Sequence, residues 1–130
     1  MAGNVLMVMH RKMLSDALIA QTATDAPFKI VAEQNYATAA LTAETCIPDI
    51  VVMEIPESGP WRSAEKCLAV CDMIRGQMPG CKQVLLCNEY DAVSCHAAIR
   101  AKQARRIDDF LFYDNSVNYL LSKLEALIEN

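Results

Sequence analysis

The sequence predicts an α/β fold in which strands and helices alternate five times along a single domain of 130 residues. Short apolar runs recur between amphipathic segments along the whole chain. The most apolar run lies between Pro48 and Pro56 and has no polar alternation, which is typical of a strand buried on both faces. Because alternating strands and helices need crossover connections, we expect a parallel sheet covered by helices on both faces.

The expected strands cover residues 5–9, 28–33, 48–56, 84–87 and 107–113. The expected helices cover residues 12–24, 37–45, 61–78 and 92–102, with a last helix after Ser116. Ser116 suits the N-cap position, and an apolar stripe follows it at helical spacing. The predicted architecture is a three-layer α/β/α sandwich of the flavodoxin-like kind, with strand order 2-1-3-4-5.

Composition and charge narrow the class of protein. With 53% hydrophobic and 22% charged residues, the chain suits a compact globule. The net charge of -4 gives no electrostatic reason to expect nucleic-acid binding by this segment. No apolar stretch is as long as a membrane span, and the first residues do not form a secretory signal, so we expect a cytoplasmic protein.

The chain has six cysteines, which we expect to be free and mostly buried thiols. Cys67 and Cys71 are four residues apart on an expected helix, but no second close Cys/His pair accompanies them. We therefore expect no metal site and no cofactor. A sensor that uses the thiols of Cys67 and Cys71, or that of Cys87, remains an alternative.

A small flavodoxin-like enzyme is another alternative, because a fold does not determine function. Against it, residues 10–13 after the first strand contain no glycine, and the whole chain has only four. A glycine-rich phosphate-binding loop is therefore not expected there, and no serine nucleophile motif occurs. We expect the protein not to be an enzyme.

Three segments resemble the receiver domains of bacterial response regulators. Residues 48–54, PDIVVME, are similar to the family's PDLVLLD strand, and residues 28–33, FKIVAE, to its FEVVGE. Residues 110–116, FLFYDNS, are similar to YLLKDAS before the last helix. The likeness covers nearly the whole chain and points to the CheY-like superfamily, in particular its NarL/LuxR-like members.

At the positions that carry the family's chemistry, the residues differ. The resemblance places Glu54 at the phosphoacceptor aspartate, and Met9 and His10 at the acidic pair that holds magnesium. The family's switch Ser/Thr corresponds to Cys87 or to its neighbour Asn88. Its lysine corresponds to Tyr113, and its switch aromatic residue corresponds to Phe110.

Magnesium needs several oxygen ligands, and phosphoryl transfer needs cations that neutralise the moving group. The residues at these positions supply few oxygens and no lysine. We therefore expect an atypical receiver, or pseudo-receiver, that is not phosphorylated in the usual way and works in signal transduction through protein contacts. It suits the regulatory part of a transcription regulator, but nothing in residues 1–130 resembles a DNA-binding helix-turn-helix.

Two hypotheses remain for Glu54. It is a solvated carboxylate at the end of its strand, or a fixed charge that imitates the phosphorylated state. The second hypothesis needs a donor, for which His10, Cys87 and Tyr113 are the candidates, because an unpaired buried carboxylate is costly.

A cluster of mixed charges marks the expected fourth helix and fifth strand. Four basic residues precede the acidic pair Asp108 and Asp109: Arg100, Lys102, Arg105 and Arg106. Such a cluster is either a solvated face or a contact surface. We expect a protein partner or a homodimer to bind at the fourth helix, the fifth strand and the last helix, and we expect neither nucleic acid nor a membrane as a partner.

Overall fold

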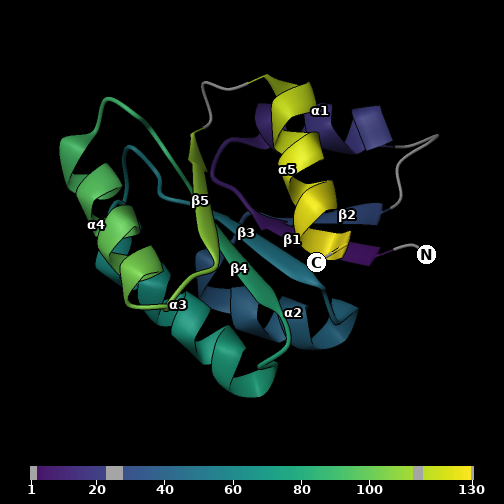
Figure 1. Ribbon diagram of the computed structural model, residues 1–130, viewed down its shortest axis with the longest axis horizontal. Coiled ribbons are helices and arrows are strands. Elements are labelled where there is room, and N and C mark those ends of the chain that lie inside the picture. Colours follow the sequence, from purple (N-terminus) through teal and green to yellow (C-terminus); the bar gives the residue numbers. More distant parts are fainter. Residues whose placement is uncertain (1–2, 23–27, 113–115, 130) are drawn as a thin grey trace.

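Figure 1 shows the computed structural model, which describes residues 3–22, 28–112 and 116–129. The strands form one parallel sheet with the order β2-β1-β3-β4-β5, which confirms the predicted topology. The strands are β1 (Gly3–Val8), β2 (Phe28–Glu33), β3 (Ile50–Glu54), β4 (Lys82–Cys87) and β5 (Asp109–Phe112). The helices are α1 (Lys12–Thr22), α2 (Ala39–Cys46), α3 (Ala64–Gln77), α4 (Ala92–Gln103) and α5 (Val117–Glu129).

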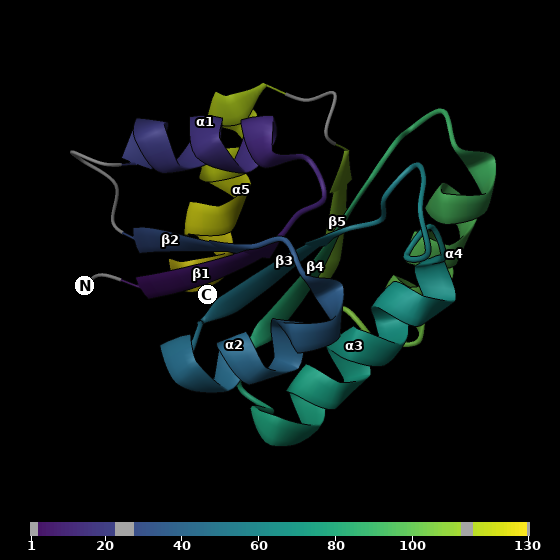
Figure 2. The same ribbon diagram turned by 180° about the vertical axis from the view of Figure 1, so that it is seen from behind.

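Helices cover both faces of the sheet, so the predicted three-layer sandwich is also confirmed (Figures 1 and 2). Helices α1 and α5 lie on one face, and α2, α3 and α4 lie on the other. Successive side chains of a strand point to opposite faces. In β3, Ile50 and Val52 pack with α1 and α5, whereas Val51 and Met53 pack with the other helices. All five residues of β3 are buried, as the unbroken apolar run predicted.

Some elements begin or end at residues other than those expected. Helix α3 begins at Ala64 instead of residue 61, because the Ser63 side chain accepts a hydrogen bond from the Lys66 N–H and caps the helix there. The second helical segment begins with a 3₁₀ turn, η1 (Tyr36–Thr38), before α2. Strand β5 is shorter than expected, and Tyr113 lies outside the described residues.

The fold brings the carboxyl ends of β1, β3 and β4 to one edge of the sheet. Val8 pairs with Met53, and Glu54 pairs with Leu86. The residues that follow these strands therefore lie close to one another at the place where parallel sheets usually carry their sites. Within the described segments, no helix is long and apolar enough to cross a membrane.

Candidate functional site

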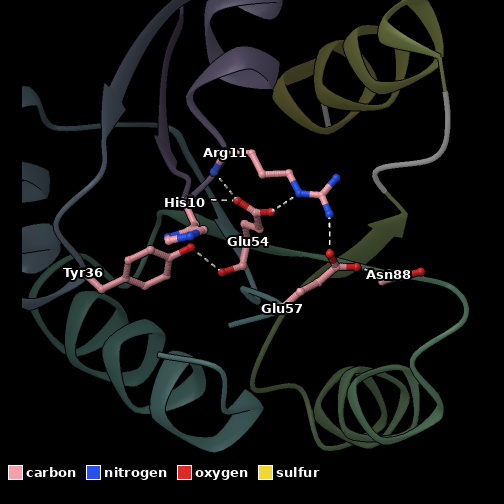
Figure 3. Close-up of polar contacts among 6 residues, drawn as sticks. All are labelled: His10, Arg11, Tyr36, Glu54, Glu57 and Asn88. Atoms are coloured by element: carbon pink, nitrogen blue, oxygen red, sulfur yellow. Dashed lines mark hydrogen bonds and ion pairs between the residues drawn. The ribbon is translucent and has the colours of Figure 1, made fainter. Parts of the chain in front are cut away.

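Glu54 ends β3, and its side chain is fully buried. Its Oε1 accepts two hydrogen bonds from the backbone of the β1–α1 loop, from the His10 N–H at 2.7 Å and from the Arg11 N–H at 2.9 Å (Figure 3). Bonds from an amide to an ionised carboxylate are among the stronger hydrogen bonds in proteins. The hypothesis of a solvated carboxylate is therefore wrong.

The Arg11 guanidinium faces the second oxygen of the same carboxylate. Its Nε lies 3.5 Å from Glu54 Oε2, which is an ion-pair contact longer than a good hydrogen bond. Another guanidinium nitrogen donates to Glu57 Oε2 at 2.5 Å. The other oxygen of Glu57 accepts a hydrogen bond from the Asn88 side-chain amide. Figure 3 shows the resulting chain of contacts, which links the β1–α1, β3–α3 and β4–α4 loops.

The backbone carbonyl of Glu54 is held from the opposite face of the sheet. The Tyr36 hydroxyl donates to it at 2.6 Å, and the buried Tyr36 ring stacks on Trp61 with 5.4 Å between ring centroids. Burial and the charge of Glu54 raise the pKa of Tyr36, so the hydroxyl stays protonated and remains a donor. Trp61 therefore packs against the core through Tyr36.

The other residues predicted for the site take different places. Met9 is fully buried in the α1/α5 core, whereas His10 is exposed and contributes its backbone N–H to Glu54. The buried Cys87 thiol donates to the Leu111 carbonyl at 3.7 Å. Phe110 is half-buried beside Phe112. The hydrogen-bond donors to Glu54 are thus two backbone amides, and the Arg11 guanidinium is its ion-pair partner; neither the His10 imidazole nor the Cys87 thiol has this role.

Arg11 is a residue of this site that the sequence pattern did not predict. The sequence contains only an indirect signal for the pairing of Arg11 with Glu54. A carboxylate that ends a fully buried strand needs a cation or several donors, and Arg11 follows the neighbouring strand β1. The backbone donors carry no sequence signal, since every residue except proline has an N–H group.

The residues at this edge do not fit a magnesium ion. Glu54 Oε1 is hydrogen-bonded to the β1–α1 loop, Glu54 Oε2 is buried beside the Arg11 guanidinium, and Met9 offers a thioether where oxygen ligands would be needed. Across the described segments, no three side chains of the His, Cys, Asp or Glu type gather closely enough to hold a metal. Arg11 supplies the positive charge beside the carboxylate.

An open hollow of about 400 Å³ lies beside this edge, between the β3–α3 loop and the start of α4. Glu57, Arg62, Asn88 and Tyr90 are among the residues that line it, and Glu54 is not. The hollow therefore reaches the outer end of the contact chain without exposing the buried carboxylate.

Burial also determines the chemistry of the thiols. It raises the pKa of Cys67, Cys71 and Cys87 to about 12 and that of Cys81 to about 11. Because the thiolate is the nucleophile and the metal ligand, these four side chains are unreactive near neutral pH. The prediction of mostly buried thiols is confirmed for these four, whereas Cys46 and Cys95 are half-buried.

The geometry is that of the response-regulator receiver fold. A response regulator from Thermotoga maritima superimposes with a TM-score of 0.78 at 18% identity over 100% of both chains. A LuxR-family DNA-binding response regulator from Staphylococcus aureus superimposes with a TM-score of 0.75 at 17% sequence identity, and the match covers 97% of this chain and 98% of the other. NtrX from Brucella abortus in complex with ATP superimposes with a TM-score of 0.78 at 21% sequence identity, and the match covers 99% of this chain but 27% of NtrX.

At these identities the likeness establishes the fold. No protein-family model matches the sequence, and no curated protein matches it either.

We predict that Glu54→Gln destabilises the protein. An amide has the same shape but carries no charge, and its NH₂ group cannot accept from the loop or pair with Arg11. The free energy of unfolding should fall by about 1.5–3 kcal/mol, the usual range for hydrogen bonds to charged groups. Urea unfolding at neutral pH measures it. Glu57→Gln is the matched control and should cost less than about 1 kcal/mol, because Glu57 is exposed. Equal losses in the two variants would contradict a special role for Glu54.

We also predict that the protein loses stability in alkaline solution. The folded state raises the pKa of four thiols to about 11–12, whereas the same thiols ionise near pH 8.5 in the unfolded chain. The contribution of these protonated thiols to the free energy of unfolding is therefore fully present below about pH 8. It falls as the pH rises toward the folded pKa values, by up to about 1.4 kcal/mol per pH unit for each thiol.

Urea unfolding in the presence of a reductant at about pH 8 and about pH 10 measures this loss. The variant Cys71→Ala removes one buried thiol and should show a smaller loss between the two pH values. The same pH dependence in both proteins would show that Cys71 is not held in its protonated form.

Proposed function

We propose that this chain is a pseudo-receiver, a regulatory domain of two-component-type signal transduction that acts through protein–protein contacts and is not phosphorylated in the usual way. The observation that carries the proposal is the occupied carboxylate of Glu54. It is fully buried, accepts two backbone hydrogen bonds and is paired with Arg11.

A phosphoacceptor must present a free carboxylate oxygen to the donor, with cations placed to neutralise the transferred group. Glu54 meets neither condition. Its Oε1 is held by the His10 and Arg11 amides and its Oε2 is buried beside the Arg11 guanidinium, so attack by either oxygen on a phosphodonor would have to displace a contact with the β1–α1 loop. Arg11 carries positive charge, but it is already shared between Glu54 and Glu57.

In this proposal the five other positions keep the correspondences that the resemblance implies. Met9 and His10 stand for the acidic pair, Cys87 and Phe110 for the switch residues, and Tyr113 for the lysine. Burial of Met9 in the core supports the loss of the cation site, because a buried thioether cannot replace a hydrated carboxylate. Glu54 is then a permanent structural charge in a site with no exchangeable ligand.

The structural neighbours support the regulatory class. Two of them are response regulators, and one of these is DNA-binding and of the LuxR family. The matched part of NtrX is 27% of that protein, so the same fold also occurs as one portion of a longer chain. By analogy, we propose that the present chain regulates an output that another segment or another protein performs, with transcription as the leading case.

The proposed contact surface is formed by α4, β5 and α5. In the described part of the sheet β5 is an edge strand next to β4, and exposed apolar side chains lie on both flanking helices. Ile99 on α4 is 42% exposed and Tyr119 on α5 is 47% exposed. Asp109 on β5 pairs with Lys102 at 3.0 Å and with Lys123 at 3.7 Å. Exposed apolar groups with charged neighbours suit a homodimer or a protein partner.

The phosphorylation part of the proposal is tested with acetyl phosphate and magnesium. We expect no phosphoryl adduct in the intact mass, because Glu54 is not available for attack. Beryllofluoride with magnesium should leave the amide NMR signals of His10 and Arg11 unshifted. A receiver domain that keeps the acidic pair and the aspartate is the positive control. A stoichiometric adduct that disappears in Glu54→Gln would overturn the proposal.

The contact part is tested by Ile99→Asp. The wild-type protein should dimerise with increasing concentration in analytical ultracentrifugation, and the variant should dimerise roughly tenfold more weakly or not at all, because it would bury a charge at the contact. Leu41→Asp is the matched control on α2, at a residue that is 64% exposed. A wild-type protein that is monomeric at every concentration would rule out the homodimer, and equal effects of the two variants would rule out this surface.

A further inference from the structure

An open hollow of about 450 Å³ lies between the β3–α3 loop and helix α3. It shares no lining residue with the hollow beside Asn88. Its volume is within the range of sites for small organic molecules, about 300–1,000 Å³, and such sites are mostly apolar with a few polar groups. The residues that line it are Pro60, Trp61, Lys66, Ala69, Val70 and Met73.

The loop that forms one wall of this hollow is fixed by contacts with the rest of the domain. The Trp61 carbonyl accepts a hydrogen bond from the Ser63 N–H at 2.7 Å, and the Ser63 side chain caps α3. The Trp61 ring stacks on the buried Tyr36 ring. A ligand that enters the hollow would therefore meet an ordered wall, and binding would cost little conformational entropy.

The other wall is one side of α3. Lys66, Val70 and Met73 are spaced by four and three residues, so their side chains lie on the same side of the helix. Val70 is buried, whereas Met73 is 57% exposed. Indole and thioether groups both make favourable contacts with aromatic rings, so Trp61 and Met73 together suit an aromatic ligand.

Lys66 supplies the only charge among the residues that line the hollow. Its ammonium group donates to the Pro60 carbonyl at 3.1 Å, which uses one of its three N–H groups. In the described segments no carboxylate forms an ion pair with Lys66, in contrast to Lys12 and Lys102. Two donors and a positive charge therefore remain for an anionic group of a ligand.

We propose that this hollow binds a small aromatic anion, such as an aromatic carboxylate. Its ring would contact Trp61, Val70 and Met73, and its anionic group would bind the Lys66 ammonium. The inference is independent of the pseudo-receiver proposal, because binding here involves neither Glu54 nor phosphorylation.

The hollow is connected to the carboxyl edge of the sheet through Trp61. This residue stacks on Tyr36, and the Tyr36 hydroxyl donates to the Glu54 carbonyl. A ligand that contacts the Trp61 ring would restrain the surface on which Tyr36 packs. Occupancy of the hollow thus provides a route by which a diffusible molecule can act on the surroundings of Glu54.

The test titrates the full chain with anilinonaphthalene sulfonate, an aromatic anion, and measures binding by isothermal titration calorimetry and by protein NMR. We expect saturable binding of one probe molecule per chain. The indole N–H signal, which Trp61 alone contributes, should shift with the dissociation constant that calorimetry gives. Amide signals distant from the hollow should keep their positions, because the folded protein binds the probe.

Two variants separate the charge of Lys66 from the net charge of the protein. Lys66→Met keeps an apolar stem and removes the ammonium, so it should bind the probe about tenfold more weakly through loss of a charge-assisted hydrogen bond. Lys29→Met is the matched control, because it makes the same change in net charge at an exposed lysine of β2 outside the hollow. It should leave the dissociation constant unchanged.

A third variant and a second probe test the fit of the ligand. Ala69→Phe places a ring at a residue that lines the hollow, so it should block binding while the amide spectrum stays that of a folded protein. Phenylnaphthylamine has the same ring system without the sulfonate and should bind the wild-type protein about tenfold more weakly.

Four results would overturn the proposal. Equal affinities for the two probes would show an apolar patch with no anion site, and equal affinities of Lys66→Met and Lys29→Met would exclude Lys66. Binding that leaves the Trp61 indole signal in place would put the ligand elsewhere. No binding at millimolar probe would exclude the hollow as a site for this class of ligand.

Discussion

A carboxylate at the end of a buried strand must be compensated, and the compensation of Glu54 determines much of the surrounding structure. An isolated charge would cost several kilocalories per mole in such a place. Two amides of the β1–α1 loop and the Arg11 guanidinium remove that cost. The loop must then follow the carboxylate closely, and the Arg11 side chain must extend toward Glu57. The local course of the chain at this edge thus follows from one desolvated charge.

A carboxylate with protein donors differs in function from one with exchangeable ligands. Metal ions and phosphoryl groups enter and leave a site according to their concentration, so a site that binds them can respond to a signal. The partners of Glu54 belong to the same chain and are always present. The charge at this edge of the sheet is therefore compensated from within the chain itself. In the proposed function, regulation then comes from contacts elsewhere on the domain.

The sequence predicted the fold well because long-range order in this architecture follows from short apolar runs. Residues 28–33 form β2 with the bounds expected, and the strand order follows from alternation and right-handed crossovers. Glu54 and its position at the end of β3 were also predicted. Its partners were not, because the His10 and Arg11 amides are backbone groups and because Arg11 lies 43 residues away along the chain. Burial of Glu54 depends on the packing of loops, which no local pattern encodes.

Trp61 is the single tryptophan of the chain and stacks on Tyr36, whose hydroxyl holds the Glu54 carbonyl. Indole emission is sensitive to the polarity and quenching groups around the ring, and Tyr36 is in direct contact with it. The protein thus carries an intrinsic fluorophore two contacts away from the buried carboxylate. Spectral changes can be assigned to one residue without labelling, so events at the carboxyl edge of the sheet can be followed in the unmodified protein in real time.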